Sequence, residues 1–175
     1  MTSQLEHGVA TRVKVVQPGD GRVGGLGPGV GVIFKIDGAD SGGAISIVEH
    51  TFDVGALVPP HIHRREDEFS IVLDGEIGFR SEDAEVVLGA GGYIVKPRNE
   101  VHAMWNAGKH PARMIEVISP AGFEDFFRQL ADMTDAGQPD LAEVAGLAAR
   151  YDLPFAEPAW LPDIIARYGL SVPGR

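Results

Sequence analysis

The chain has 175 residues, of which 23% are charged and 44% hydrophobic, a composition typical of a folded globular protein with a single core. Its net charge of −10 argues against a nucleic-acid or anionic-membrane partner, since both require a basic surface. The chain has no cysteine, which excludes disulfides and thiolate sites, and no apolar segment of signal or membrane-spanning length, so we expect a soluble, cytoplasmic protein.

The N-terminal part alternates between strand-like and glycine-rich sequence. Residues 11–16 predict a first strand, and residues 32–36 (VIFKI) a second. The segment between them, 18–31, is rich in glycine and invites a dinucleotide-loop interpretation. That fingerprint requires a helix after the glycines, whereas here Pro28 interrupts them and a β-branched run follows. We therefore expect a loop over residues 18–31.

The middle of the chain consists of short apolar runs separated by turn residues. These runs predict strands at residues 44–52, 61–63, 69–73, 76–80, 85–88, 93–96, 101–105 and 112–118. Asp74-Gly75 is a dipeptide that favours a two-residue hairpin turn. No gap in this region could hold a crossover helix, so the sheet must be largely antiparallel, in a sandwich or a barrel.

After Pro120 the hydrophobic period becomes helical. A second helical pattern follows Pro139, and a third, at residues 162–169, ends at Gly169. We expect these helices to pack on the barrel or on a partner chain, within one domain. The apolar residues of the first two patterns are Phe123, Phe126, Phe127, Leu130 and Met133, then Leu141, Val144, Ala145 and Ala148.

Two of the six histidines, His61 and His63, lie two residues apart and would face the same side of a strand. Imidazole nitrogens bind transition metals, so such a pair can chelate an ion. Glu68 is an odd number of residues further on and would face the opposite side of a continuous strand. The charged residues 64–67 must therefore bend the chain if Glu68 is to join the histidines.

A lone His-x-His is weak support for a metal site, because a surface accident explains it equally well. A second segment, residues 91–106, also places a histidine, His102, just after a proline turn and among apolar residues. Burying an imidazole there is costly unless it has a partner, and a metal ion would be one.

Together the two segments resemble the motifs of the cupins, specifically small bacterial single-domain ones. The first motif is filled by Gly55, His61, His63, Glu68 and Gly75, and the second by Gly91, Pro97, His102 and Asn106. Asn99 departs from the family, which usually has glycine there. Asparagine is the non-glycine residue that best tolerates a left-handed backbone, so the departure is mild. The resemblance covers residues 40–120.

This resemblance implies a mainly β fold, an antiparallel double-stranded β-helix (the jelly-roll cupin barrel) with a C-terminal helical extension. It implies one domain over residues 1–175, with a barrel core at about 30–120 and a helical tail at about 121–170. It also implies a divalent transition metal, Fe, Mn, Ni, Co, Cu or Zn, on four ligands: His61, His63, Glu68 and His102. A metal-free cupin with these histidines as core residues is the alternative.

The remaining histidines carry weaker signals. His7 lies near the N-terminus and His110 in a turn, whereas His50 is expected in a sheet, with a cavity-lining role left open. Strand alternation points Met104 inward and Trp105 to the opposite face. Alternation from Glu68 likewise points Ser70 and Val72 inward. Such an apolar lining suits a flat, hydrophobic or aromatic small molecule.

Among cupins the chain looks most like the bacterial quercetin 2,3-dioxygenase-like group. That resemblance implies a metal-dependent dioxygenase for a flavonol-like or other hydroxylated aromatic or enol substrate, with Glu68 as ligand and possible general base. A non-oxidative isomerase, decarboxylase or polyketide-tailoring cyclase, or a non-catalytic binding cupin, remain alternatives. The resemblance to the cupin family also suggests a homodimer, and the strand predicted at residues 11–16 is our candidate for pairing with a partner chain.

Overall fold

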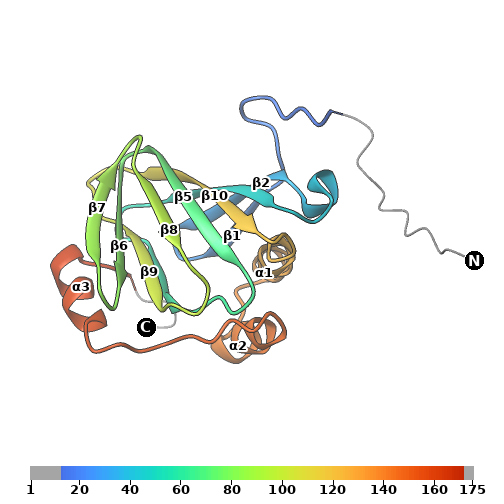
Figure 1. The fold of residues 1–175 in the computed structure, drawn as a ribbon. Helices are drawn as coiled ribbons and strands as arrows, with labels where there is room; N and C mark the ends of the chain where they lie inside the picture. Colours follow the sequence, from blue (N-terminus) through green and yellow to red (C-terminus); the bar gives the residue numbers. More distant parts are fainter. Residues whose placement is uncertain (1–12, 172–175) are drawn as a thin grey trace, which may run out of the picture.

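The computed structural model describes residues 13–171, and in them ten strands form two antiparallel sheets (Figure 1). The larger sheet has six strands in the order β1-β2-β3-β10-β5-β8. Their bounds are β1 Val23–Gly27, β2 Val30–Ile36, β3 Ser46–Phe52, β10 Ala112–Ser119, β5 Asp67–Asp74 and β8 Tyr93–Lys96.

The smaller sheet has four strands in the order β4-β9-β6-β7. Their bounds are β4 Leu57–His61, β9 His102–Asn106, β6 Glu76–Ser81 and β7 Glu85–Gly89. Because the chain passes repeatedly between the two sheets, the architecture is a double-stranded β-helix. The predicted antiparallel fold with a C-terminal helical extension is confirmed.

The barrel core lies between the inner faces of the two sheets. Every second residue of β3 and β10 is buried, as expected for strands with one face on a core. Phe52 and Met114 from the larger sheet pack with Ile77, Phe79 and Met104 from the smaller one. Met104 and Val72 face this interior, as alternation predicts, whereas Trp105 lies on the opposite face.

Three helices follow the barrel: α1 Glu124–Ala136, α2 Leu141–Arg150 and α3 Leu161–Tyr168. Figure 1 shows α1 and α2 near one end of the larger sheet and α3 beside β6 and β7. Helix α1 packs through Phe126 and Leu130 on residues of β2 and β3. Helix α3 packs through Ile164 on Trp105. The apolar residues of α1 and α3 therefore form packing surfaces of this chain, whereas Leu141 and Ala145 of the second predicted stripe are exposed and α2 packs through Leu147 and Ala148.

The glycine-rich segment 18–31 is not entirely a loop, because it contains β1. Gly24 lies so close to helix α1 that a Cβ atom would be 2.5 Å from the Cβ of Ala131. A residue without a side chain lets the strand and the helix approach each other. The glycines that suggested a loop thus allow β1 to pack closely against helix α1.

Three further predictions about local structure were wrong. Residues 13–16 form no strand, and residues 11–12 lie outside the described part of the chain. The strand predicted at 61–63 lies earlier in the chain, as β4, which ends at His61. The prolines of β4 are tolerated because it is an edge strand, where a residue without an N–H donor need not interrupt the sheet. Asp74-Gly75 is not a hairpin turn, because β5 and β6 belong to different sheets.

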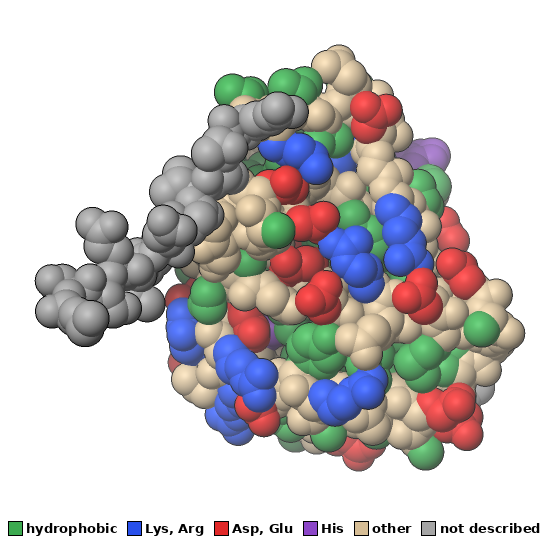
Figure 2. All heavy atoms as spheres, turned by 90° about the vertical axis from the view of Figure 1, so that its right-hand side faces the viewer, with side chains coloured by type: hydrophobic (Ala, Val, Ile, Leu, Met, Phe, Trp, Pro, Cys, Tyr) green, Lys and Arg blue, Asp and Glu red, His purple; other side chains and the backbone are tan. Residues whose placement is uncertain are grey.

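The face of the molecule shown in Figure 2 carries both signs of charge. On the face shown in Figure 2, acidic and basic side chains are interspersed and no continuous basic surface is seen. Within residues 13–171, none of the helices has both the length and the apolarity needed to cross a bilayer.

Candidate metal centre

Four buried side chains, His61, His63, Glu68 and His102, converge at one end of the barrel. One ligand atom from each lies within 4.8 Å of those of the others, so these four residues, hereafter the metal group, could hold a metal ion. His61 ends β4 and is paired with His102, the first residue of β9. This cross-strand pairing brings the first and second motifs together, as the sequence predicts.

A bend after His63 returns Glu68 to the histidines. The bend lies at Arg64 and Arg65, inside the charged segment that was predicted to turn the chain. The N–H of Asn99 donates to the carbonyl of His63 at 2.7 Å, and Asn99 has a φ of 69°. The predicted left-handed asparagine is therefore confirmed, and it ties the second motif to the first.

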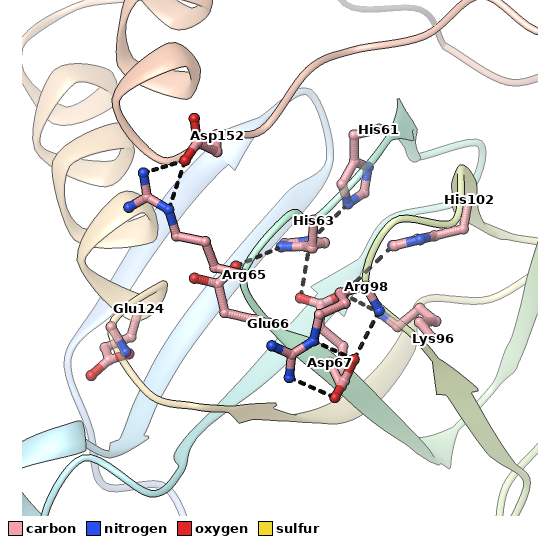
Figure 3. Close-up of polar contacts among 12 residues, drawn as sticks. His61, His63, Arg65, Glu66, Asp67, Lys96, Arg98, His102, Glu124 and Asp152 are labelled. Carbon is pink, nitrogen blue, oxygen red and sulfur yellow. Dashed lines mark hydrogen bonds and ion pairs between the residues drawn. The ribbon is translucent and has the colours of Figure 1, made fainter.

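The charges of the bend hold it in place rather than merely facing solvent. Asp67 accepts from the backbone N–H and the guanidinium of Arg98, each at 2.8 Å, and Arg65 pairs with Asp152 beyond helix α2 (Figure 3). Glu66 is buried, with its carboxylate 3.7 Å from His63 Nδ1. Glu66 is thus one of the charged residues of the predicted bend, but it faces the metal group instead of the solvent.

The hydrogen bonds of the histidines fix which ring nitrogen is free. Nδ1 of His61 is 2.7 Å from the Pro59 carbonyl, and Nδ1 of His102 is 3.2 Å from the Glu100 carbonyl. A carbonyl can only accept, so each Nδ1 carries the proton and each Nε2 has a bare lone pair. This arrangement, with the non-ligating N–H donated to a backbone carbonyl, is typical of metal-binding histidines.

Burial sets the charge states that metal binding requires. It lowers the pKa of His61 well below its usual range and also lowers that of His102. Burial alone would raise the pKa of Glu68, but His63 and Lys96 beside it outweigh that effect and hold it well below its ordinary value. At neutral pH the two imidazoles are therefore neutral and Glu68 is an anion.

The geometry fits a metal ion better than it fits a closed hydrogen-bond network. Nε2 of His61 and Nε2 of His63 face each other at 3.1 Å (Figure 3). Nε2 of His102 is buried and, among the described residues, has no hydrogen-bond partner. Buried polar atoms rarely lack a hydrogen-bond partner, and a divalent ion would supply the missing partner of this nitrogen. Three imidazoles and a carboxylate suit several transition metals without selecting one.

A second buried polar cluster, which sequence reasoning missed, supports the group. Lys96 Nζ lies 2.9 Å from Glu68 Oε2 and 2.6 Å from Glu116 Oε2, and Ser70 Oγ donates to Glu116 at 3.1 Å. Both charges occupy inward positions of strands, Lys96 on β8 and Glu116 on β10. Charged residues in the inward rows of the predicted strands were the signal that could have revealed them.

The metal group opens onto a cavity of about 1720 Å³, lined by residues of the larger sheet, of β4 and β9, of the three helices and of the segment before α3. Its lining is mostly apolar, as predicted; outside the metal group the polar lining residues are His50, Glu116, Thr134, Gln138, Asp140 and Glu157. His50 therefore does face the cavity. His110 lies in an exposed turn, and His7 lies outside the described residues. The apolar lining residues include Leu26, Val30, Leu57, Val58, Met104, Phe126 and Phe127.

Comparisons with known proteins agree with this architecture. A family model described as a cupin domain matches residues 48–118, which contain both motifs. A germin-like protein of Arabidopsis thaliana (subfamily T member 2) is 41% identical over 69 residues, covering 37% of this chain and 31% of that protein. The quercetin 2,3-dioxygenase of Bacillus subtilis is 29% identical over 90 residues, covering 51% of this chain and 26% of that protein. The chain thus spans less than a third of either relative.

Solved structures share the fold at low identity. The polyketide cyclase RemF from Streptomyces resistomycificus superposes with a TM-score of 0.54 at 24% identity, covering 62% of this chain and 80% of that one. A cupin from Shewanella frigidimarina gives the same TM-score at 23% identity, covering 65% of this chain and 96% of that one. At such identities the likeness concerns the fold alone.

Proposed function

We propose that this chain, which belongs to the cupin superfamily, is a metal-dependent dioxygenase that cleaves a flavonol-like or other hydroxylated aromatic or enol molecule. The observation that carries the proposal is the placement of the metal group at the end of a mostly apolar cavity. The partial similarity to the quercetin 2,3-dioxygenase of Bacillus subtilis supports it.

The residues of the site suit the binding of an acidic enol. His61, His63, Glu68 and His102 would hold a divalent ion, which would lower the pKa of a bound enol hydroxyl and bring dioxygen and substrate together. The apolar lining excludes water and favours a flat aromatic body. In the overall reaction, both atoms of dioxygen enter the product as a ring bond breaks.

Glu68 is the group best placed to take the substrate proton. Its carboxylate is ionised, buried and within 3.5 Å of two of the imidazoles. Lys96, 2.9 Å from Oε2, holds the carboxylate in position and balances part of its charge. We therefore assign Glu68 two roles, ligand and general base, with Lys96 as its positioning residue.

A second candidate is a non-oxidative reaction, such as an isomerisation or a cyclisation, at the same metal group. Glu116 favours it, because burial raises the pKa of this cavity-lining carboxyl to about 7, although Lys96 opposes the shift. A group that titrates near neutrality suits proton transfer in either direction. Such a reaction would proceed without oxygen.

The test is oxygen uptake by the purified protein loaded in turn with each candidate metal, with quercetin as substrate. The dioxygenase proposal predicts uptake in step with quercetin loss, and its abolition in Glu68→Gln. Turnover of quercetin under argon would support the non-oxidative alternative instead. No uptake with quercetin or any related enol, on protein shown to contain the metal, would exclude the dioxygenase and leave a binding function.

A further inference from the structure

His50 is a cavity-lining histidine outside the metal group. It comes from β3, where its side chain is buried in the inward row that includes Val48 and Phe52. Its ring is held edge-on by Phe127 of helix α1, with ring centres 5.0 Å apart, and by Phe52 at 6.4 Å. The ring is therefore fixed between the sheet and a helix, on a wall of the cavity.

The hydrogen bonds of His50 leave one nitrogen free. Nδ1 lies 3.0 Å from the carbonyl oxygen of Gly31, which can only accept, so Nδ1 carries the proton. Burial lowers the pKa of His50 to about 4, against the opposing effect of the Gly31 bond, so the ring is neutral at pH 7. Nε2 is then unprotonated, and its lone pair can accept a hydrogen bond.

Glu116 lies on the same wall, one step along the neighbouring strand. In the pairing of β3 with β10, Met114 is opposite His50 and Glu116 is opposite Val48. His50 and Glu116 are thus diagonal neighbours that face inward, about 7–8 Å apart by the usual geometry of antiparallel strands. Ser70 and Lys96 fix the Glu116 carboxylate, which also lines the cavity.

Both groups can accept a further hydrogen bond: His50 through Nε2, and Glu116 through the acceptor positions of its carboxylate that Ser70 and Lys96 do not use. The ammonium of Lys96 is already engaged by Glu68 and Glu116, so it does not make the site selective for an anion. A neutral hydroxyl is the donor that both acceptors can use without bringing a new charge into a buried site.

We propose that His50 Nε2 and Glu116 form a hydrogen-bonding subsite for substrate hydroxyl groups remote from the enol that faces the metal group. The subsite makes the protein selective for polyhydroxylated over singly hydroxylated aromatic enols. This selectivity rests on the proposed function, because it assumes that an aromatic enol occupies the cavity. His50 is a specificity-determining residue in this scheme and takes no part in holding the metal.

The test is anaerobic binding of two probes, measured by calorimetry on metal-loaded protein. Quercetin carries several ring hydroxyls, whereas flavonol, its parent compound, has the enol hydroxyl alone. His50→Phe keeps an aromatic ring against Phe127 but removes Nε2. His50→Gln restores an acceptor near the same place. Metal content is measured for each protein to show that the metal group is intact.

The wild type is expected to bind quercetin more tightly than flavonol. His50→Phe should weaken quercetin binding about 10-fold, the effect of one hydrogen bond, and leave flavonol binding unchanged, while His50→Gln recovers part of the loss.

A measurement that needs no variant is nitrogen NMR with labelled histidine. The His50 Nε2 resonance should shift on addition of quercetin and stay in place on addition of flavonol.

Equal binding of the two probes by the wild type, binding of neither, or an unmoved Nε2 resonance contradicts the subsite. An equal loss for both probes in His50→Phe also contradicts it, because that result indicates general packing. Since binding is measured without oxygen, the two proposals fail separately. Selective binding without oxygen uptake would contradict the dioxygenase proposal and still support the subsite.

Discussion

The pKa of His50 ties this residue to the acid stability of the fold. The unfolded residue takes up its proton near pH 6.5 and the folded one only near pH 4. Between these values the unfolded state binds more protons, so the free energy of unfolding falls as the pH falls. We expect His50 to account for about 3 kcal/mol of that loss between pH 7 and pH 4.

The measurement is denaturant unfolding of the metal-free wild type and His50→Phe at several pH values. The variant should lose less stability on acidification than the wild type. His61 and His102 titrate in both proteins, so their contributions cancel in the difference. Parallel stability curves for the two proteins would show that His50 is not held neutral by the fold.

Lys96 is a second residue whose role can be measured. It is fully buried between two carboxylates, Glu68 and Glu116. Lys96→Met would leave the two carboxyl groups buried without their cation, and breaking a buried pair in this way typically costs about 3–5 kcal/mol. The matched control, Lys109→Met at an exposed position, should stay within about 0.5 kcal/mol of the wild type by denaturant unfolding. Similar stabilities of the two variants would contradict the buried ion-pair cluster.

At the scale of elements, the packing of helix α3 depends on a glycine in the smaller sheet. Gly78 of β6 lies opposite Trp105 of β9, and a Cβ atom at Gly78 would be 2.1 Å from the indole ring. Gly78→Ala must push the ring toward α3, so we expect a loss of about 1–3 kcal/mol. Gly146→Ala, in helix α2 with open space around it, should instead gain up to about 1 kcal/mol.

Denaturant unfolding of both glycine variants checks this pair, with tryptophan fluorescence as the probe. A neutral or stabilising Gly78→Ala would mean that Trp105 does not lie over β6 as described. The opposite signs expected for the two substitutions exclude a general effect of replacing glycine by alanine.

The strands and helices were largely predictable, because their hydrophobic periods are clear. Ser46–Phe52 and Ala112–Ser119 alternate, and Glu124–Ala136 carries a helical stripe. The sequence did not reveal which strands share a sheet, because Asp74-Gly75 joins consecutive strands whether or not they pair. Strand β1 was missed because its glycines, which serve contact with α1, have the composition of a loop.

At the scale of the whole molecule, the metal group was predictable and its surroundings were not. The four residues were identified through two spaced motifs, and the structure gathers them in one place. Their neighbours Lys96 and Glu116, and the cavity-facing His50, come from other strands. Only the pairing of those strands brings them to the site. The homodimer and the single-domain organisation remain predictions.

The central claim is that the gathered residues bind a divalent metal ion. The most direct measurement is elemental analysis of the protein as isolated, together with His63→Ala, His102→Ala and His110→Ala. The wild type and His110→Ala, which changes an exposed turn, should carry about one transition-metal ion per chain, as expected of one four-ligand group. His63→Ala and His102→Ala should carry much less. Equal metal content in all four proteins would contradict the assignment.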